Sequence, residues 1–202
     1  MDNLARKIAA CSPANWIASN GSQWIDTGRI WSASCKVELK YRSTAYLTSG
    51  EAKFCGGADT RNAGLYGIGI GRTLNYIALW AFGTNYVVAP SITRANALNV
   101  DLVDTLDLSN GAFTTLRDGV TSYTTFTTPV NYVGTSSVYL FKDHSPAYPY
   151  PAVGRIYYYK LWASGALIQH LVPYVVNGTA CMRDLISGAF YANKGSGALS
   201  HG

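Results

Sequence analysis

The sequence predicts an all-β protein, a two-sheet antiparallel sandwich of about a dozen short strands. Two segments near the ends, 16–28 and 181–197, surround turns of Gly, Asn, Ser and Asp with aromatic or aliphatic residues, which is typical of short strands. Between them, segments of alternating polar and apolar residues succeed one another. At 202 residues the chain fits one undivided β domain, and its ends meet if the two segments pair.

The clearest strand is 35–42, because Val37, Leu39 and Tyr41 alternate with charged residues, as in a strand with one buried face. Asp118-Gly119 predicts a two-residue hairpin between 112–116 and 121–126. Gly165 is expected to turn the chain between 155–162 and 167–174. The other expected strands are 65–71, with alternating glycines, 75–83, 100–108 and 137–141.

Residues 1–15 differ from the jelly-roll domain expected at 16–202. Leu4, Ile8 and Cys11 recur at helical spacing, and Pro13 ends the pattern, so a short N-terminal helix or arm is expected. This segment either packs on the edge of its own domain or frays, or it docks on another subunit through these three residues.

The composition is polar but poor in charge. Charged residues make up 13%, against roughly 25% in ordinary soluble domains, and 15 tyrosines and 20 glycines take their place. Such surfaces are common in secreted adhesins, phage fibres and virion shells. The net charge of +5 includes no basic run longer than Arg6-Lys7, so nucleic-acid binding is not expected, whereas an anionic glycan or an acidic protein fits.

The start of the chain is too polar for a signal peptide, and no apolar stretch is long enough to cross a membrane. An extracellular type of surface without an export signal predicts release by cell lysis, as for virion proteins made in the host cytoplasm. The four cysteines lack metal-ligand spacing. They are expected to be buried thiols, with a Cys35–Cys55 disulfide as the alternative if those strands are neighbours.

Several of these segments resemble one family in order and spacing. They are 16–28, 54–58, 138–141, 154–162, 167–173 and 183–197. Together they resemble concanavalin A-like (LamG/laminin-G-type) jelly-roll domains of phages and gut bacteria. The resemblance implies a jelly roll. It leaves the function open, because this fold carries lectins, glucanases, adhesion modules and virion decorations. Residues 60–135 match no pattern of that family.

Catalysis is not expected. Glucanases of this fold need two carboxylates facing one cleft, but the two glutamates, Glu38 and Glu51, lie far apart in sequence. Along 100–108, Asp104 is expected on the opposite face from Asp101 and Asp107, which would lie about 20 Å apart at strand rise. The histidines have no evident nucleophile partner.

A glycan or a protein partner is expected to meet exposed aromatic residues. Pro146, Pro149 and Pro151 make 142–151 a loop that holds out two tyrosines. The contact candidates are Trp80, Tyr86, Tyr148 and Tyr150, with His144 and Arg61 as polar partners. Tyr157, Tyr159 and Trp162 are expected in the sheet core.

No metal site is assigned from the sequence. Asp59 with Asn62, or Asp143, offers oxygen ligands for calcium, although such turn residues more often bond their own backbone.

The sequence therefore favours a non-enzymatic phage virion protein, a capsid decoration, head fibre or tail component with a lectin-like domain for host surface glycans. It would contact other virion proteins through its N-terminal arm and form a homo-oligomer or part of a larger assembly. The alternative is a bacterial carbohydrate-binding or adhesion module at the cell surface or outside the cell. A glycoside hydrolase is disfavoured. Neither nucleic acid nor membrane is an expected partner.

Overall fold

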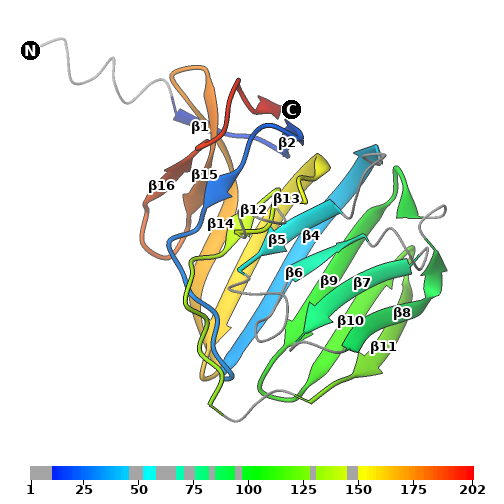
Figure 1. Cartoon of the computed structure of the whole chain (residues 1–202). Helices are drawn as coiled ribbons and strands as arrows, with labels where there is room; N and C mark the ends of the chain where they lie inside the picture. The colour runs from blue at the N-terminus through cyan, green and yellow to red at the C-terminus, as the bar shows by residue number, and fades with distance from the viewer. Residues whose placement is uncertain are drawn as a thin grey trace, which may run out of the picture.

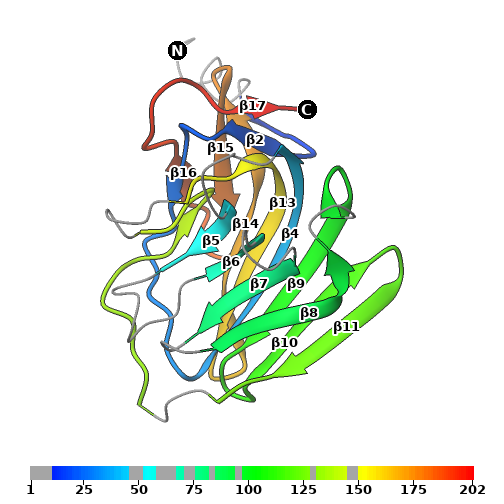
Figure 2. The same cartoon turned by 45° about the vertical axis from the view of Figure 1, so that its right-hand side comes forward.

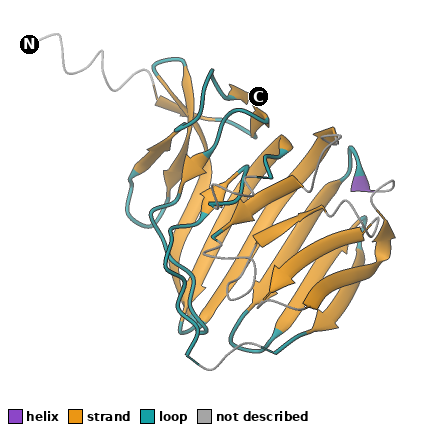
Figure 3. Cartoon of the chain, in the orientation of Figure 1, coloured by secondary structure: helices purple, strands orange, loops and turns teal. Residues whose placement is uncertain are grey.

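The chain folds into two antiparallel β-sheets that face each other (Figure 1). The computed structural model describes residues 11–45, 52–57, 67–70, 76–81, 85–93, 97–127, 131–144 and 150–202. Within these residues nearly all regular structure is strand, as Figure 3 shows, and Ala97 alone is helical. The predicted all-β sandwich is therefore confirmed.

Sheet A has eleven strands, and each of its strand pairs is antiparallel. Its main path runs β11 (Val120–Thr125), β10 (Ala112–Arg117), β9 (Asp101–Asp107), β4 (Cys35–Ala45), β13 (Val153–Ala163), β14 (Ala166–Val176), β15 (Thr179–Asp184) and β16 (Phe190–Ala192). Three short strands join beside this path: β1 (Cys11–Pro13) on β14, and β2 (Ile17–Asn20) between β13 and β17 (Ser200–His201).

Sheet B has six strands and covers one face of sheet A, as the turned view in Figure 2 shows. Its order is β3 (Ile25–Asp26), β12 (Tyr139–Leu140), β5 (Ala52–Gly56), β6 (Gly67–Ile70), β7 (Tyr76–Ala81) and β8 (Asn85–Thr93). The glycine-rich segment expected as a strand is β6, and its glycines allow close approach: a Cβ on Gly69 would lie 2.0 Å from the Ala52 carbonyl oxygen.

The core forms where the alternating strands of sheet A turn their apolar sides to sheet B. In β4, Val37, Leu39 and Tyr41 are fully buried while the intervening charged residues stay half-exposed. Tyr41 stacks on Phe54 of sheet B with ring centroids 4.4 Å apart. Trp31 donates its indole N–H to the buried Tyr159 hydroxyl at 3.0 Å. Both contacts hold large rings in fixed positions, and the Tyr41–Phe54 stack joins the two sheets.

Two-residue turns set the register of sheet A. Asp118 and Gly119 both have positive φ, 49° and 80°, as the type I′ hairpin predicted between β10 and β11 requires. Ser164-Gly165 makes the same turn between β13 and β14. Asn177-Gly178 repeats it between β14 and β15, which the sequence analysis did not identify.

The two end segments pair, as expected. Ile25 forms an antiparallel bridge with Asn193. The Gln23 side chain donates to the Ser196 carbonyl at 2.9 Å, and the Lys194 amide donates to the Trp24 carbonyl at 2.8 Å. These bonds join residues more than 160 positions apart, so the chain between them is closed into one unit.

The expected N-terminal helix is corrected at its last residue. Cys11 is exposed and begins strand β1, which pairs with β14 through Cys11↔Val176 and Pro13↔Tyr174. Proline is tolerated there because β1 is an edge strand. Leu4 and Ile8 lie outside the described residues, so the helix itself stays a prediction there.

All four cysteines are free thiols. The alternative of a Cys35–Cys55 disulfide is wrong, and the strands that carry the two residues, β4 and β5, are not neighbours in one sheet. Cys35, Cys55 and Cys181 are buried, as expected of structural thiols, whereas Cys11 is exposed.

Candidate functional site

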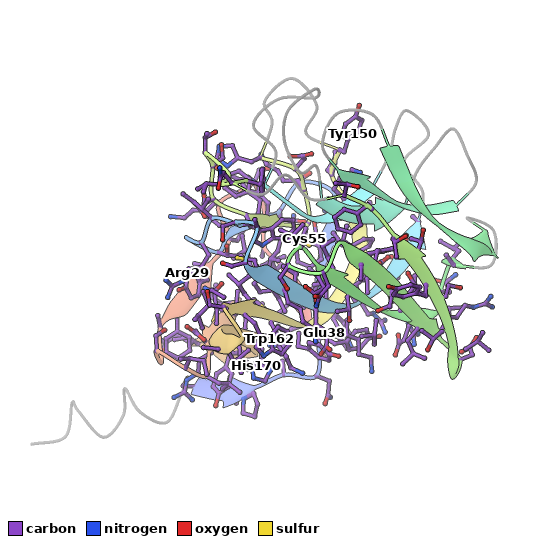
Figure 4. All side chains as sticks on the ribbon, turned by 90° about the horizontal axis from the view of Figure 1, so that it is seen from below. Arg29, Glu38, Cys55, Tyr150, Trp162 and His170 are labelled. Carbon is purple, nitrogen blue, oxygen red and sulfur yellow. The ribbon has the colours of Figure 1, made fainter. Side chains whose placement is uncertain are left out.

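The face of sheet A that points away from sheet B, here called the outer face, carries alternating rings and charges. Its centre is β13, where Tyr158, Lys160 and Trp162 are all half-exposed, while Tyr159 and Leu161 are fully buried. In Figure 4, Trp162, Glu38 and His170 lie together on one side of the molecule and Tyr150 lies on the opposite side, with buried Cys55 between them.

A bulge in β13 brings two adjacent tyrosines to this face. In the pairing with β4, Ile156 lies opposite Tyr41 and Tyr158 opposite Lys40, so Tyr157 has no partner residue. The extra residue changes which residues face outward, and both Tyr157 and Tyr158 are half-exposed. Tyr159 is core, as expected, whereas the expectation that Tyr157 and Trp162 are also core is wrong.

An ion pair occupies the middle of the face. Lys160 Nζ donates to Glu38 Oε1 at 2.9 Å, with side-chain exposures of 27% and 22%. Lys160 Nζ also lies 4.6 Å from the ring centroid of Tyr158. Partial burial, and then the neighbouring Glu38 carboxylate, raise the pKa of the Tyr158 hydroxyl, which therefore stays protonated and able to donate.

Trp162 and His170 complete this central patch. Lys36 Nζ lies 5.2 Å from the Trp162 ring centroid, and His170 is the register partner of Lys160 on β14. Burial, with a further contribution from the Lys160 charge, lowers the pKa of His170, so the imidazole is neutral at pH 7. Neutral imidazole offers one donor and one acceptor.

A second polar group lies further along the same face. Arg42 Nε donates to Asp101 Oδ1 at 2.6 Å, and the Tyr157 hydroxyl donates to the same oxygen at 2.8 Å. Burial alone would raise the pKa of Asp101, but these two bonds outweigh it, and the pKa lies below its usual value. Asp101 is thus an ionised anchor that orients Arg42 and Tyr157.

This arrangement combines apolar ring faces with fixed polar groups. Half-exposed rings offer apolar faces, and the carboxylate, ammonium, imidazole and phenol groups between them offer donors and acceptors at fixed positions on a rigid sheet. The carboxylates of this face in the described residues are all engaged by neighbours, and Asp107 accepts from the side chains of Ser109 and Asn110. Glu38 and Asp101 are each bonded to cations, and Asp104 points into the core from β9, as the strand periodicity predicts.

A separate ring cluster lies at the edge of sheet B. Tyr139 stands between Trp24 and His144, with ring centroids 4.2 Å away on each side. His144 Nδ1–H donates to the Ser137 carbonyl at 3.1 Å, and Lys142 Nζ lies 4.2 Å from the Trp24 centroid. Because Tyr139 is covered on both faces by neighbouring rings, this cluster ties Trp24 of the first end segment to residues 139–144 and offers little free ring surface.

Of the six residues predicted as contacts, the structure describes four. His144 belongs to the edge cluster. Tyr150 is half-buried and its carbonyl accepts the Lys53 amide at 2.9 Å, so its backbone is held against β5. Trp80 and Tyr86 are register partners on β7 and β8, where the structure describes only the backbone. Arg61 and Tyr148 lie outside the described residues.

The calcium candidates from the sequence are Asp59 with Asn62, or Asp143. Asp143 is fully buried, and Asp59 and Asn62 lie outside the described residues. In the part of the chain that is described, no three His, Cys, Asp or Glu residues are grouped closely enough to hold a metal ion. No helix in that part is both long and apolar enough to span a membrane.

The outer-face residues were missed because Tyr157, Tyr159 and Trp162 were all assigned to the core, without regard to the alternation of faces along 155–162. Under period two, Tyr157, Tyr159 and Leu161 share one face, and the apolar Leu161 marks that face as core. The adjacent Tyr157-Tyr158-Tyr159 run was the available signal, because three aromatic residues in succession must place rings on both faces whatever the register.

Two comparisons with known proteins find no match, since neither a family model nor a curated protein sequence matches this chain. Solved structures do match. The extracellular region of zebrafish Gpr126/Adgrg6 aligns with 94% of this chain at a TM-score of 0.58 and 14% identity. A Bacteroides ovatus ATCC 8483 protein, provisionally described as carbohydrate-binding, aligns with 95% at a TM-score of 0.57 and 12% identity.

This chain spans 26% of the length of the zebrafish chain and 60% of the length of the Bacteroides chain. Both likenesses extend over nearly all of the sequence given, and at such low identity they show the fold alone. The chain is a two-sheet antiparallel β-sandwich of the kind found in these two proteins.

Proposed function

We propose that this protein is a non-enzymatic carbohydrate-binding module whose ligand lies across the outer face of sheet A. The observation that carries the proposal is the succession Tyr158, Lys160 and Trp162 along β13, in which two half-exposed rings flank the Lys160–Glu38 ion pair. A sugar offers the complementary pattern, since its apolar ring faces stack on aromatic rings while its hydroxyls bond to charged groups. The fold likeness to a protein provisionally described as carbohydrate-binding supports the same assignment.

The absence of catalysis is part of this proposal. Retaining glycosidases place two carboxyl groups about 5 Å apart, and inverting enzymes place them about 6.5–9.5 Å apart. Glu38 and Asp101 lie on neighbouring strands, but Glu38 is opposite Thr105, four residues from Asp101 along β9. That offset alone is about 13 Å at strand rise. Asp107 is closer to Glu38, two residues from Thr105 or about 7 Å along β9. Its two oxygens accept from Ser109 and Asn110, however, and Glu38 is held by Lys160, so neither carboxyl is free to act on a substrate. Binding without cleavage is therefore expected.

The test is a glycan array followed by calorimetry on the best ligand, using the natural sequence and Trp162→Ala. The natural sequence should bind at least one glycan without releasing products, and Trp162→Ala should weaken binding. Tyr123→Ala is the matched control, because Tyr123 is 61% exposed on β11, four strands away in the same sheet. Equal weakening by both variants, or no glycan bound at all, would refute the proposal.

We further propose that the module serves in a phage virion, docked through the arm that precedes β1, residues 1–10. The support for this is compositional: a weakly charged, tyrosine-rich chain and the apolar residues Leu4 and Ile8 at helical spacing. A bacterial adhesion module is the alternative. Purified particles of the source phage, probed with an antibody to this domain, would distinguish the two, because only a virion component remains with intact particles.

A further inference from the structure

Cations on the outer face are more numerous than carboxylates. Six basic side chains project from its strands: Lys36, Lys40, Arg42, Arg155, Lys160 and Arg183. Three carboxylates share the face: Glu38, Asp101 and Asp107. Two of the carboxylates neutralise particular partners, since Glu38 bonds Lys160 while Asp101 bonds Arg42 and lies 3.7 Å from Lys40. The third, Asp107, is the register partner of Lys36 but forms no ion pair with it and instead accepts hydrogen bonds from Ser109 and Asn110.

The other three cations lie against rings instead of carboxylates. Lys36 lies over Trp162, the Arg155 guanidinium is 4.2 Å from the Trp16 ring centroid, and the Arg183 guanidinium is 5.2 Å from that of Tyr174. No carboxylate within the described residues is within 4.0 Å of these three side chains. Their charge is therefore free to meet an anion from outside.

Each of these cations forms a pair with a ring, here called a cation–ring unit: Lys36 with Trp162, Arg155 with Trp16, and Arg183 with Tyr174. Arg183 Nη1 donates to the Tyr174 hydroxyl at 3.2 Å, and its guanidinium also lies 5.7 Å from the Phe190 ring centroid. A guanidinium held beside a ring keeps N–H donors for a planar anion, and carboxylate is the group that fits two of them at once. A ring beside a cation is also suited to a sugar ring that bears a carboxylate.

The spacing of the units indicates how dense the ligand's charge is. Arg155 and Trp162 stand near opposite ends of β13, roughly 20 Å apart at strand rise. The Glu38 carboxylate lies on this face between them. Nucleic acid carries about one negative charge per 1.7 Å of duplex and would bring phosphates against Glu38. A chain with neutral sugars between its acidic ones avoids that repulsion.

We infer that the ligand of the outer face is an acidic polysaccharide whose carboxylates are received by the cation–ring units of Lys36, Arg155 and Arg183. This inference rests on the proposed carbohydrate-binding function and specifies its ligand class.

The experiment measures binding of the full chain to immobilised acidic polysaccharides, namely bacterial capsular glycans, pectins and glycosaminoglycans. Each is placed beside its own carboxyl-reduced form, which keeps the sugar backbone and loses the charge. At least one acidic form should bind about tenfold more tightly than its reduced partner, since a hydrogen-bonded ion pair contributes on that scale. That preference should decline as salt is raised.

The variants Lys36→Gln, Arg155→Gln and Arg183→Gln, alone and combined, should bring the two forms toward equal affinity. Arg29→Gln is the matched control, because Arg29 is exposed in the loop that follows β3 of sheet B and should leave the preference unchanged.

The outcomes separate this inference from the proposed function. Binding of reduced and acidic forms with equal affinity would overturn the inference and leave carbohydrate binding intact, whereas binding of neither form and of no other glycan would overturn both. A duplex oligonucleotide is included as a competitor. If it binds the face more tightly than every glycan, the acidic-polysaccharide inference is wrong. A loss of preference in Arg29→Gln equal to that in the triple variant would also overturn it.

Discussion

Glu38 on β4 and Lys160 on β13 are register partners whose charged atoms meet at 2.9 Å on the outer face of sheet A. The pair stands between Tyr158 and Trp162 and is about a quarter exposed on each side. It forms because β4 and β13 run antiparallel with the longest shared register in the sheet. Its position makes it the group that a ligand lying across both rings would touch.

Replacing both rings of this face should separate binding from folding. Tyr158→Ala with Trp162→Ala is expected to weaken glycan binding by more than tenfold, because anchors at the centre of a contact contribute on the order of 2 kcal/mol each. Both side chains are half-exposed, so the cost in unfolding free energy should be smaller than for a core ring. Calorimetry and urea titration measure the two quantities. Tyr159→Ala, at a fully buried site, should instead cost about 3 kcal/mol or more.

The Glu38–Lys160 pair should matter more for binding than for stability. A double-mutant cycle with Glu38→Gln and Lys160→Met is expected to give a coupling of about 0.2–1 kcal/mol in unfolding free energy, because both side chains are partly exposed to water. Each single variant should nevertheless weaken glycan binding. A coupling above about 2 kcal/mol, or unchanged binding in both variants, would show that the pair is structural.

Asp104 should make stability fall as pH rises. Burial raises the pKa of its carboxyl to about 7, although the hydrogen bond from the Tyr41 hydroxyl at 2.8 Å opposes the rise. The unfolded chain ionises this group near pH 4. The folded state therefore binds more protons between about pH 4 and pH 7, and unfolding free energy falls there by up to about 1.4 kcal/mol per pH unit.

Asp104→Asn should remove that slope. The variant is expected to be more stable than the natural sequence above pH 7 and to lose this advantage toward pH 4, where the natural carboxyl is protonated in both states. Urea titrations at pH 4.5, 6 and 8 measure the difference. If the unfolding free energies of the two proteins change with pH in parallel, the pKa of Asp104 is the same in the folded and unfolded states, and the prediction is wrong.

The four thiols should differ in reactivity. Cys11 is exposed and should react with a disulfide reagent within minutes, whereas buried Cys35, Cys55 and Cys181 should react only after unfolding. Burial raises the pKa of Cys181 to about 11 and that of Cys55 further still, which lowers the fraction of reactive thiolate. Melting temperature should not change with reductant. Fewer than four thiols counted in denaturant without reductant would contradict this.

Truncations at the N-terminus should locate the boundary between arm and domain. Deleting residues 1–10 is expected to leave the melting temperature nearly unchanged, because β1 begins at Cys11. Deleting 1–13 should lower it, since the β1–β14 pairing is lost. If the arm docks on a neighbouring subunit, deleting residues 1–10 should already be enough to abolish association in sedimentation experiments. If association survives the deletion of residues 1–10, another surface of the domain mediates it.

The sequence by itself determined the architecture. Alternation in 35–42 predicted which side of β4 is buried, because side chains of a strand point to opposite faces in turn. Asp118-Gly119 and Gly165 predicted their hairpins, because a type I′ turn needs positive φ that glycine adopts without strain. The two end segments predicted their own pairing, now seen at Ile25 and Asn193.

Only the tertiary structure decided the candidate site. Tyr157 and Tyr158 share the outer face because Tyr157 is an extra residue in β13: Ile156 and Tyr158 lie opposite Tyr41 and Lys40, which are adjacent in β4. This bulge arises from pairing with a strand more than a hundred residues away. The same pairing sets Lys160 against Glu38. Period-two alternation predicts which face of its own strand a residue lies on. It does not predict where one strand has an extra residue relative to the strand with which it pairs. For that reason the sequence predicted the sandwich, and the register between strands determined which rings and charges meet on its surface.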